Sequence, residues 1–142
     1  MDRVYSTPLL DKLGIRPGMR VAIVGELEDA DEPAGGDEPF RARLEGRTSD
    51  ISEGDPKPDS DIVLLSADST DDLARLGELR LTIRPNGAIW VVSRKGRAAT
   101  IRDVEVIAAA RAHDLVDNKV VSFSATRTAL RLVIPVALRP KT

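Results

Sequence analysis

Three short runs of aliphatic residues, almost free of charge, recur along the chain and are separated by segments with helical periodicity. They cover residues 20–25, 61–66 and 88–92. A strand that is apolar on both faces must be covered on both faces, which is typical of a parallel sheet between two layers of helices. The alternation therefore predicts an α/β fold with a mostly parallel sheet and helices on both faces.

Helices are predicted between these strands from apolar residues at helical spacing and from capping side chains. We expect helices over residues 8–13, over 38–44, from Ser69 or Thr70 to about Ile83, and from Thr100 to His113. Residues 47–51 form a weaker candidate strand. Residues 85–87, Pro-Asn-Gly, predict a turn into the third apolar strand.

Two further β-rich runs end the chain, at residues 116–123 and 128–136, and a four-residue connection between them favours an antiparallel hairpin. Pro135 cannot donate a ladder hydrogen bond, so the last strand is expected to lie at a sheet edge there or to end nearby. This edge raises one functional hypothesis, a dimeric interaction protein that pairs through residues 128–134.

Length and composition favour one domain over residues 1–142, with a mainly aliphatic core, because the chain has only four aromatic residues. The absence of cysteine excludes disulfides and thiolate chemistry. No apolar run approaches the length of a membrane span and no signal peptide precedes the fold, so we predict a cytoplasmic protein with no membrane partner.

Charge is unevenly distributed along the chain. Most acidic residues lie in residues 26–72, and most basic residues lie in 73–142. Residues 26–39 combine acids with proline and glycine and have almost nothing to bury, so they are predicted to form an exposed acidic loop. The net charge of −2 and the lack of aromatic residues among the basic ones argue against a nucleic-acid partner.

Three stretches together resemble class I methyltransferases: residues 15–21 before the first strand, residues 79–87 before the third, and the closing helix with its hairpin. The whole chain also resembles a family of short bacterial proteins known only as a domain of unknown function, whose start has the form YS-x-PL-x-x-KLGI-x-PG-x-RV. Residues 5–21 read YSTPLLDKLGIRPGMRV. The resemblance implies a truncated, Rossmann-like methyltransferase fold.

In that fold, a glycine-rich turn after the first strand approaches S-adenosylmethionine, and an acid after the second strand holds its ribose. Here Gly25 is followed by Glu26 and further acids, which oppose a ligand carboxylate. The segment between the apolar strands at 20–25 and 61–66 has room for about one strand, whereas the full methyltransferase fold has two strands in this interval. Asp50, Glu53 and Asp68 are the remaining candidate donor contacts, and each is equally compatible with an ordinary surface acid.

A basic group follows the third apolar strand. Arg94, Lys95 and Arg97, with Arg102, precede or begin a predicted helix, an arrangement that suits an anionic small molecule. The alternative is that these cations pair with the acidic loop. His113 is expected at the end of a helix, where a partial positive charge interacts favourably with the helix dipole. The sequence contains no Gly-x-Ser-x-Gly motif, which would indicate a serine nucleophile for this histidine to assist. We predict no catalytic residue. We also predict no metal site, because residues 29–40 begin like a calcium-binding loop but lack its later ligand, its turn glycine and its final acid.

These observations favour a non-catalytic, methyltransferase-like binding or regulatory module with no bound cofactor. The first alternative is an S-adenosylmethionine-dependent methyltransferase with a divergent donor site that includes Gly25, Glu26, Asp50 and Asp68. The second alternative is the dimeric interaction protein. An anionic small molecule and a second copy of the chain are the candidate partners.

Overall fold

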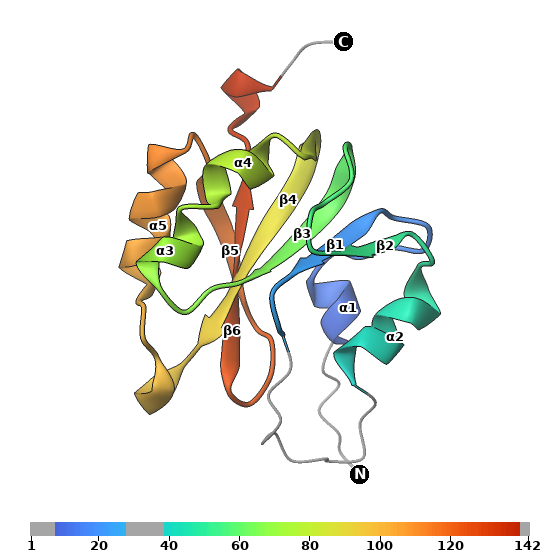
Figure 1. Cartoon of the computed structure of the whole chain (residues 1–142), viewed down its shortest axis with the longest axis horizontal. Coiled ribbons are helices and arrows are strands. Elements are labelled where there is room, and N and C mark those ends of the chain that lie inside the picture. The colour runs from blue at the N-terminus through green and yellow to red at the C-terminus, as the bar shows by residue number, and fades with distance from the viewer. Residues whose placement is uncertain (1–7, 28–38, 140–142) are drawn as a thin grey trace.

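A computed structural model describes residues 8–27 and 39–139. Its six strands form one sheet in the order β2-β1-β3-β4-β6-β5 (Figure 1). Strands β1, β2, β3 and β4 run parallel to one another, and β6 runs antiparallel to both β4 and β5. The predicted α/β class, a mostly parallel sheet with an antiparallel C-terminal hairpin, is confirmed. The strand bounds are β1 Val21–Val24, β2 Ile51–Glu53, β3 Ser60–Ser66, β4 Ile83–Arg94, β5 Val116–Ser122 and β6 Arg127–Val133.

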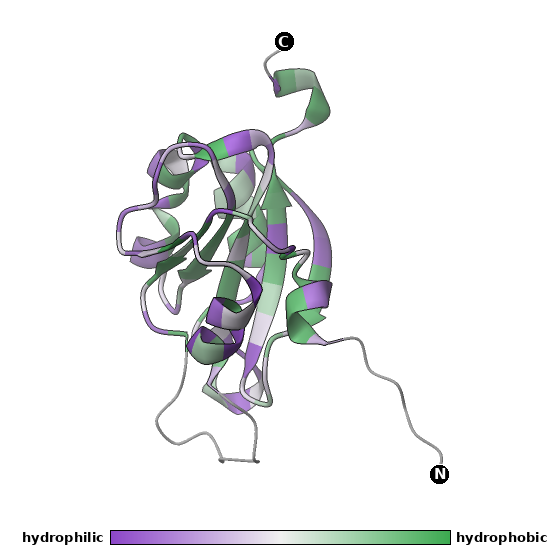
Figure 2. Cartoon of the chain, turned by 90° about the vertical axis from the view of Figure 1, so that its right-hand side faces the viewer, coloured by the Kyte–Doolittle hydropathy of each residue, from purple (hydrophilic) through white to green (hydrophobic). Residues whose placement is uncertain are grey.

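Helices cover both faces of the sheet, as the apolar strands predict (Figure 1). Side chains of the first two helices pack in one buried cluster, and side chains of the other three pack in a second. Figure 2 shows the hydrophobic residues concentrated on the strands between these layers. The helices are α1 Leu9–Lys12, α2 Phe40–Arg47, α3 Thr70–Leu73, α4 Leu76–Arg80 and α5 Asp103–Ala112, with short 3-10 turns η1 Gly96–Ala98 and η2 Val136–Leu138.

Trp90 joins the first helix to the sheet. Its side chain is completely buried, and its indole Nε1 donates a hydrogen bond of 3.0 Å to the carbonyl oxygen of Leu13. Leu13 is the C-cap of α1, where helix carbonyls lack partners within the helix. The indole therefore caps the helix while its ring fills the core.

The segment between β3 and β4 differs from the prediction in two ways. The helix from Ser69 is divided into α3 and α4, although Ser69 does cap its start by accepting from the amide of Asp72 at 3.1 Å. The predicted turn at residues 85–87 lies inside β4, because Ser60 pairs with Ile83 and Ile62 pairs with Ala88. The residues between these two pairs form a bulge in a continuous strand.

The short strand β2 begins where the predicted strand at 47–51 ends, because α2 continues to Arg47. Within the described residues it is the one strand between β1 and β3 in sequence, which agrees with the expected loss of a strand. The chain then passes from β2 across β1 to β3 through residues 54–59 alone. Such parallel crossovers usually contain a helix, and this one has none.

The C-terminal hairpin corrects the expectation that the last strand forms an edge. Strand β6 lies between β4 and β5, with Leu130 and Leu132 buried, so β5 is the edge strand. Pro135 follows the last ladder residue, Val133, which agrees with the alternative that the strand ends nearby. An interaction through residues 128–134 as a free edge is therefore excluded by the sheet order.

Residues 28–38 of the predicted acidic loop lie outside the described residues, as do residues 5–7 of the N-terminal block. At the described start of that loop, Glu26 is exposed, whereas Leu27 is buried. None of the helices in residues 8–27 and 39–139 is long and apolar enough to cross a membrane.

Candidate functional site

Open α/β sheets bind their ligands beyond the carboxyl ends of the parallel strands. We call this side of the molecule the carboxyl edge. It is formed by the residues that follow β1, β2, β3 and β4, and by the start of the antiparallel strand β6. The residues at this edge include Gly25, Glu26, Glu53, Asp68, Arg94, Lys95 and Arg127.

Gly25 is required by the backbone at the end of β1. Its φ is +90°, and a Cβ placed on it would lie 3.0 Å from the Cβ of Ser66 on the neighbouring strand. Glu26 is exposed, and Leu27 turns inward with 5% of its surface accessible. The loop after β1 therefore directs one apolar side chain into the core, at the place where the resemblance predicts further glycines.

Leu27 shares its buried cluster with two aromatic rings, Phe40 and Phe123. Their centroids are 5.0 Å apart at an interplanar angle of 52°. Phe40 begins α2, which precedes one edge strand, β2, and Phe123 follows the other edge strand, β5. This aromatic contact connects two distant elements and places apolar material beneath the carboxyl edge.

Asp68 occupies the centre of the carboxyl edge and has several partners. Its Oδ1 accepts from the amide of Arg94 at 3.1 Å, and its Oδ2 lies 3.7 Å from Nε of Arg94 and 3.8 Å from Nη1 of Arg127. Its carbonyl oxygen accepts from the hydroxyl of Thr100, and its amide donates to Asp72 at 2.9 Å. Asp68 therefore links β3, β4, β6 and the segment before α5.

Arg127 is the most buried cation of this group, with 5% of its side chain exposed. A buried guanidinium requires an anionic partner, which Asp68 supplies. Sequence reasoning placed Arg127 in the hairpin connection, and nothing in its sequence neighbourhood distinguishes it from a surface arginine. Its role arises because β6 starts beside the end of β4, where Arg94 pairs in register with Arg127.

The other predicted anion contacts are more accessible. Lys95 donates from Nζ to the hydroxyl of Ser122 at 2.7 Å, which joins the end of β4 to the end of β5. Arg97 lies in η1, is exposed, and forms no ion pair within residues 8–27 and 39–139. The structure thus brings Arg94 and Lys95 to the carboxyl edge and leaves Arg97 on the adjoining surface turn.

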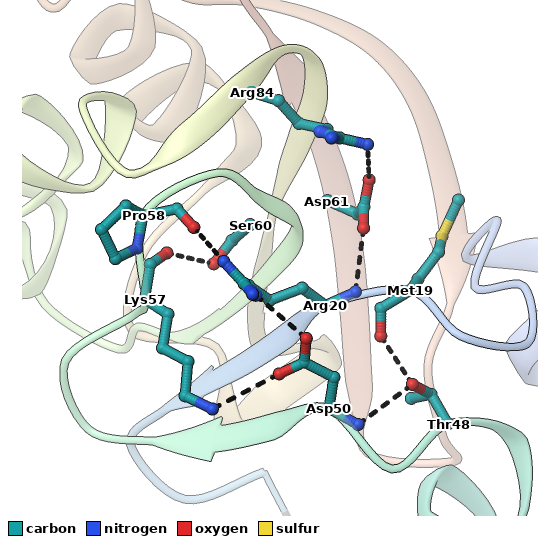
Figure 3. Close-up of polar contacts among 9 residues, drawn as sticks. All are labelled: Met19, Arg20, Thr48, Asp50, Lys57, Pro58, Ser60, Asp61 and Arg84. Atoms are coloured by element: carbon teal, nitrogen blue, oxygen red, sulfur yellow. Dashed lines mark hydrogen bonds and ion pairs between the residues drawn. The ribbon is translucent and has the colours of Figure 1, made fainter.

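Asp50 is placed at the opposite, amino edge and is not brought together with Gly25, Glu26 and Asp68. Its Oδ2 accepts from Nε of Arg20 at 3.0 Å, and its Oδ1 lies 3.4 Å from Nζ of Lys57 (Figure 3). The hydrogen bond from Arg20 is the main cause that lowers the pKa of the Asp50 carboxyl, and burial opposes it. Asp50 therefore serves an ion network.

This network fastens the short crossover that leads into β3. Nη1 of Arg20 donates to the carbonyl of Pro58 at 2.6 Å, and the backbone amide of Arg20 donates to Asp61 at 2.8 Å (Figure 3). Asp61 also accepts from Arg84 at 3.0 Å. Arg20 thus connects the starts of β1 and β3 with the crossover between β2 and β3.

Glu53 occupies the position that the resemblance assigns to a ribose-binding acid, at the carboxyl end of β2. Its carboxylate pairs with Arg41 of α2, and 64% of its side chain is exposed. It pairs in register with Ile23 of β1, and Gly54 after it has a φ of +91°. Of the two acids considered near the weak strand, Glu53 is therefore the one at the carboxyl edge.

His113 lies away from this edge, at the C-cap of α5. A Cβ placed on Gly77 of α4 would lie 2.9 Å from its Nδ1, so the ring packs closely on that glycine. No cluster of three carboxylate or imidazole groups suited to a metal ion occurs in the part of the chain that the structure describes. The histidine thus contributes to packing between α4 and α5.

The sequence matches no family model and no curated protein. The backbone, in contrast, resembles solved structures. One is the pyocyanin biosynthetic protein PhzM, with a TM-score of 0.58 and 16% identity over 88% of this chain and 53% of PhzM. The chain therefore spans about half the length of PhzM.

Two other similar structures are nearer in length to this chain. A putative methyltransferase from Thermoplasma acidophilum has a TM-score of 0.59 and 9% identity over 97% of this chain and 79% of its own. A SAM dependent methyltransferase from Aquifex aeolicus has a TM-score of 0.58 and 13% identity over 89% and 88%, respectively. At these identities the likeness establishes a methyltransferase-like, Rossmann-like fold.

Proposed function

We propose that this protein is a methyltransferase-like binding or regulatory module that does not catalyse methyl transfer. The observation that carries the proposal is the engagement of Asp68. Its carboxylate contacts two guanidinium groups and a backbone amide, one of the guanidinium groups being buried. Moving Asp68 to contact a ligand would break its hydrogen bond with the amide of Arg94 and withdraw negative charge from beside the buried guanidinium of Arg127, and both changes oppose ligand binding.

The loop after β1 supports the same proposal. To open space beside Gly25, Leu27 would have to leave the buried cluster that contains Phe40. Exposing a buried leucine costs about 1.5–3 kcal/mol, which a donor would have to repay from its own binding energy. Glu26 adds a negative charge where the donor carboxylate would lie.

The second candidate function is an S-adenosylmethionine-dependent methyltransferase with a divergent donor site. The solved structures that resemble the chain include methyltransferases, and in this respect the comparisons favour the second candidate over the first. Gly25, Glu26 and Asp68 would then line the site, Glu53 would hold the ribose, and Asp50 would act indirectly by anchoring β2.

Calorimetric titration with S-adenosylmethionine distinguishes the two functions. The first function predicts no heat of binding. Micromolar binding that S-adenosylhomocysteine displaces would contradict it. If binding occurs, Glu53→Gln should weaken it about tenfold under the second function, because a ribose hydroxyl would lose a charged acceptor worth about 1.5 kcal/mol. Glu45→Gln, which removes another partner of Arg41, is the matched control.

Three finer assignments belong to the same proposal. The chain is a single cytoplasmic domain over residues 1–142 with an acidic loop at 26–39 that is exposed except at Leu27. It is a member of the short bacterial family with the YS-x-PL start. Its ligand is an anionic small molecule held near Arg94, Lys95 and Arg97, an assignment supported by the exposure of Arg97 and by the hydrogen bond that positions Lys95.

A further inference from the structure

A row of three residues crosses the sheet in register from β4 through β6 to β5. Trp90 of β4 pairs with Arg131 of β6, and Arg131 pairs with Lys119 of β5. Directly opposed residues in an antiparallel pair point to the same face of the sheet. Trp90 packs in the same buried cluster as α1, so Arg131 and Lys119 also lie on the α1 face, which is opposite to α5 (Figure 1).

This row places two cations directly against each other. Like charges at opposed positions of an antiparallel pair are destabilising. A third cation, Arg139, lies close by, since its Nε donates to the carbonyl oxygen of Ile134 at 2.9 Å. Burial is the main cause that lowers the pKa of Arg131, and the positive charge of Arg139 lowers it further. The fold therefore gathers three positive charges around Arg131.

Acidic side chains do not compensate these charges within residues 8–27 and 39–139. Arg131 forms no ion pair and no side-chain hydrogen bond there. The nearest acid of α1, Asp11, is paired with Arg47 at 2.9 Å. Asp117 of β5 pairs in register with Leu132, which belongs to the opposite buried cluster, so Asp117 lies on the other face of the sheet.

The end of α1 is the other source of negative charge near Arg131, and its carbonyl oxygens already have donors. The indole of Trp90 donates to Leu13, and Nζ of Lys119 donates to the carbonyl oxygen of Lys12 at 3.2 Å. The remaining carbonyls of α1 accept from backbone amides. A guanidinium has five N–H donors, and a cation that is half-buried without an anion or acceptor is unfavourable.

We propose that Lys119, Arg131 and Arg139 form a binding site for the phosphate group of a small molecule. A guanidinium presents its donors in a planar fork that matches phosphate oxygens. Arg131 and Arg139 are both half-buried, which suits a small ligand that enters between side chains better than a flat anionic surface. The site is separate from the carboxyl edge, where β6 begins at Arg127.

Titration with inorganic phosphate, followed by the NMR signals of the arginine Nε–Hε groups, tests the site directly. The signals of Arg131 and Arg139 should shift together, with one dissociation constant, and by more than in chloride at equal ionic strength. The signal of Arg111, which is exposed on α5, should not follow them. An Arg131 signal that does not move, or that moves equally in chloride, would overturn the proposal.

A substitution localises the binding. Arg131→Gln should raise the dissociation constant for phosphate, measured at Arg139, by about tenfold or more, because the charge-assisted hydrogen bonds of one guanidinium are lost. Arg111→Gln is the matched control, since it removes the same charge from an exposed position on the other face. Equal effects of the two substitutions would mean a general attraction between charges and would contradict a site.

Stability without phosphate separates a binding role for Arg131 from a structural one. Arg131→Gln should raise the urea midpoint in phosphate-free buffer, because it removes the repulsion between Arg131 and Lys119. Phosphate should stabilise the original protein and not the variant, since only a bound ligand shifts the folding equilibrium. A lower midpoint for Arg131→Gln in phosphate-free buffer would show that the guanidinium serves the fold, and would overturn the proposal.

Two sources of phosphate are distinguished by sedimentation with vesicles of phosphatidylglycerol and phosphatidylcholine. The protein should remain in the supernatant. Co-sedimentation that Arg131→Gln abolishes would assign the site to a membrane surface and overturn a small ligand. The outcome is independent of the proposed function, because Arg94 reports on the carboxyl edge in the same NMR titration and either site can fail alone.

Discussion

Gly87 is the residue at which an added methyl group would have the clearest effect. A Cβ there would lie 2.9 Å from the carbonyl oxygen of Asp61, 3.0 Å from that of Ser60 and 3.1 Å from that of Arg84. All three atoms belong to the backbone of the bulge and the strand beside it, so none can rotate away. The close backbone oxygens around Gly87 explain why the bulge in β4 includes a glycine at this position.

We predict that Gly87→Ala lowers the free energy of unfolding by about 1–3 kcal/mol, the usual cost of overpacking. Gly46→Ala is the control, because a Cβ there meets nothing within 4 Å and alanine favours the helix by up to about 1 kcal/mol. Urea denaturation measures both. Equal effects of the two substitutions would contradict the close contact at Gly87.

Sequence reasoning at the residue scale succeeded where the cause is local. Ser69 could be predicted as a cap because a helix start needs an acceptor three residues before its free amides. Arg127 and Leu27 could not be found, since their burial depends on strands that meet only after the sheet forms. Asp50 and Glu53 are both near the weakly predicted strand. Asp50 precedes β2 at the amino edge and Glu53 ends it at the carboxyl edge, so an error of a few residues in the predicted bounds is enough to misplace either acid.

At the scale of elements, the crossover from β2 to β3 depends on charged contacts where a helix would ordinarily supply apolar ones. Arg20 binds Asp50 and the carbonyl of Pro58, and Lys57 binds Asp50 from within the crossover. Asp55 also approaches Arg75, which follows α3, at 3.8 Å. Besides its backbone pairing with β1, the short edge strand is therefore anchored by the side chains of Asp50 and Arg20.

This ion pair predicts that the stability of the protein depends on pH in the acid range. Because pairing with Arg20 lowers the pKa of Asp50, its stabilising effect is complete above the ordinary value of about 3.9 and is lost as the pH falls through the lower value of the folded protein. In Arg20→Gln, the pKa of Asp50 should rise toward the ordinary value, as measured by NMR titration of its carboxyl carbon.

Lys57→Gln provides the comparison, since the hydrogen bond from Arg20 is the larger cause of the low pKa. Its effect on Asp50 should be in the same direction and smaller. A pKa that does not change in Arg20→Gln would show that Asp50 is not held by this contact in solution.

Element types were more predictable than element bounds. The three apolar strands and the closing hairpin were recognisable because buried strands and turns have distinct compositions. The division of the helix after Ser69 and the strand order of the hairpin were not, since both depend on packing between distant segments. In the sheet β6 contacts β4, whereas β5, which contains the polar residues 117–119, lies at the edge.

At the scale of the whole molecule, β4 unites the two buried layers. Ile89 and Val91 belong to one cluster, and Trp90 and Val92 belong to the other. Neither layer can lose its packing without exposing the same strand. The two helical layers should therefore behave as one cooperative unit.

We predict that urea unfolding followed by Trp90 fluorescence and by far-ultraviolet circular dichroism gives coincident transitions, as a two-state domain requires. Trp90 is the single tryptophan and is completely buried, so its emission should shift to longer wavelength on unfolding. Fluorescence that changes at lower urea than the helical signal would show that the layer containing α1 unfolds separately.

The crossover of residues 54–59 also affects the unfolded chain. Pro56 and Pro58 restrict the backbone of this short connection even when the protein is unfolded. A chain with fewer accessible conformations loses less entropy when its ends are fixed, and each such proline contributes about 0.4–1 kcal/mol. Part of the free energy that keeps β2 in the sheet therefore comes from the unfolded chain, whose conformational entropy the two prolines lower, and not from a contact in the folded molecule.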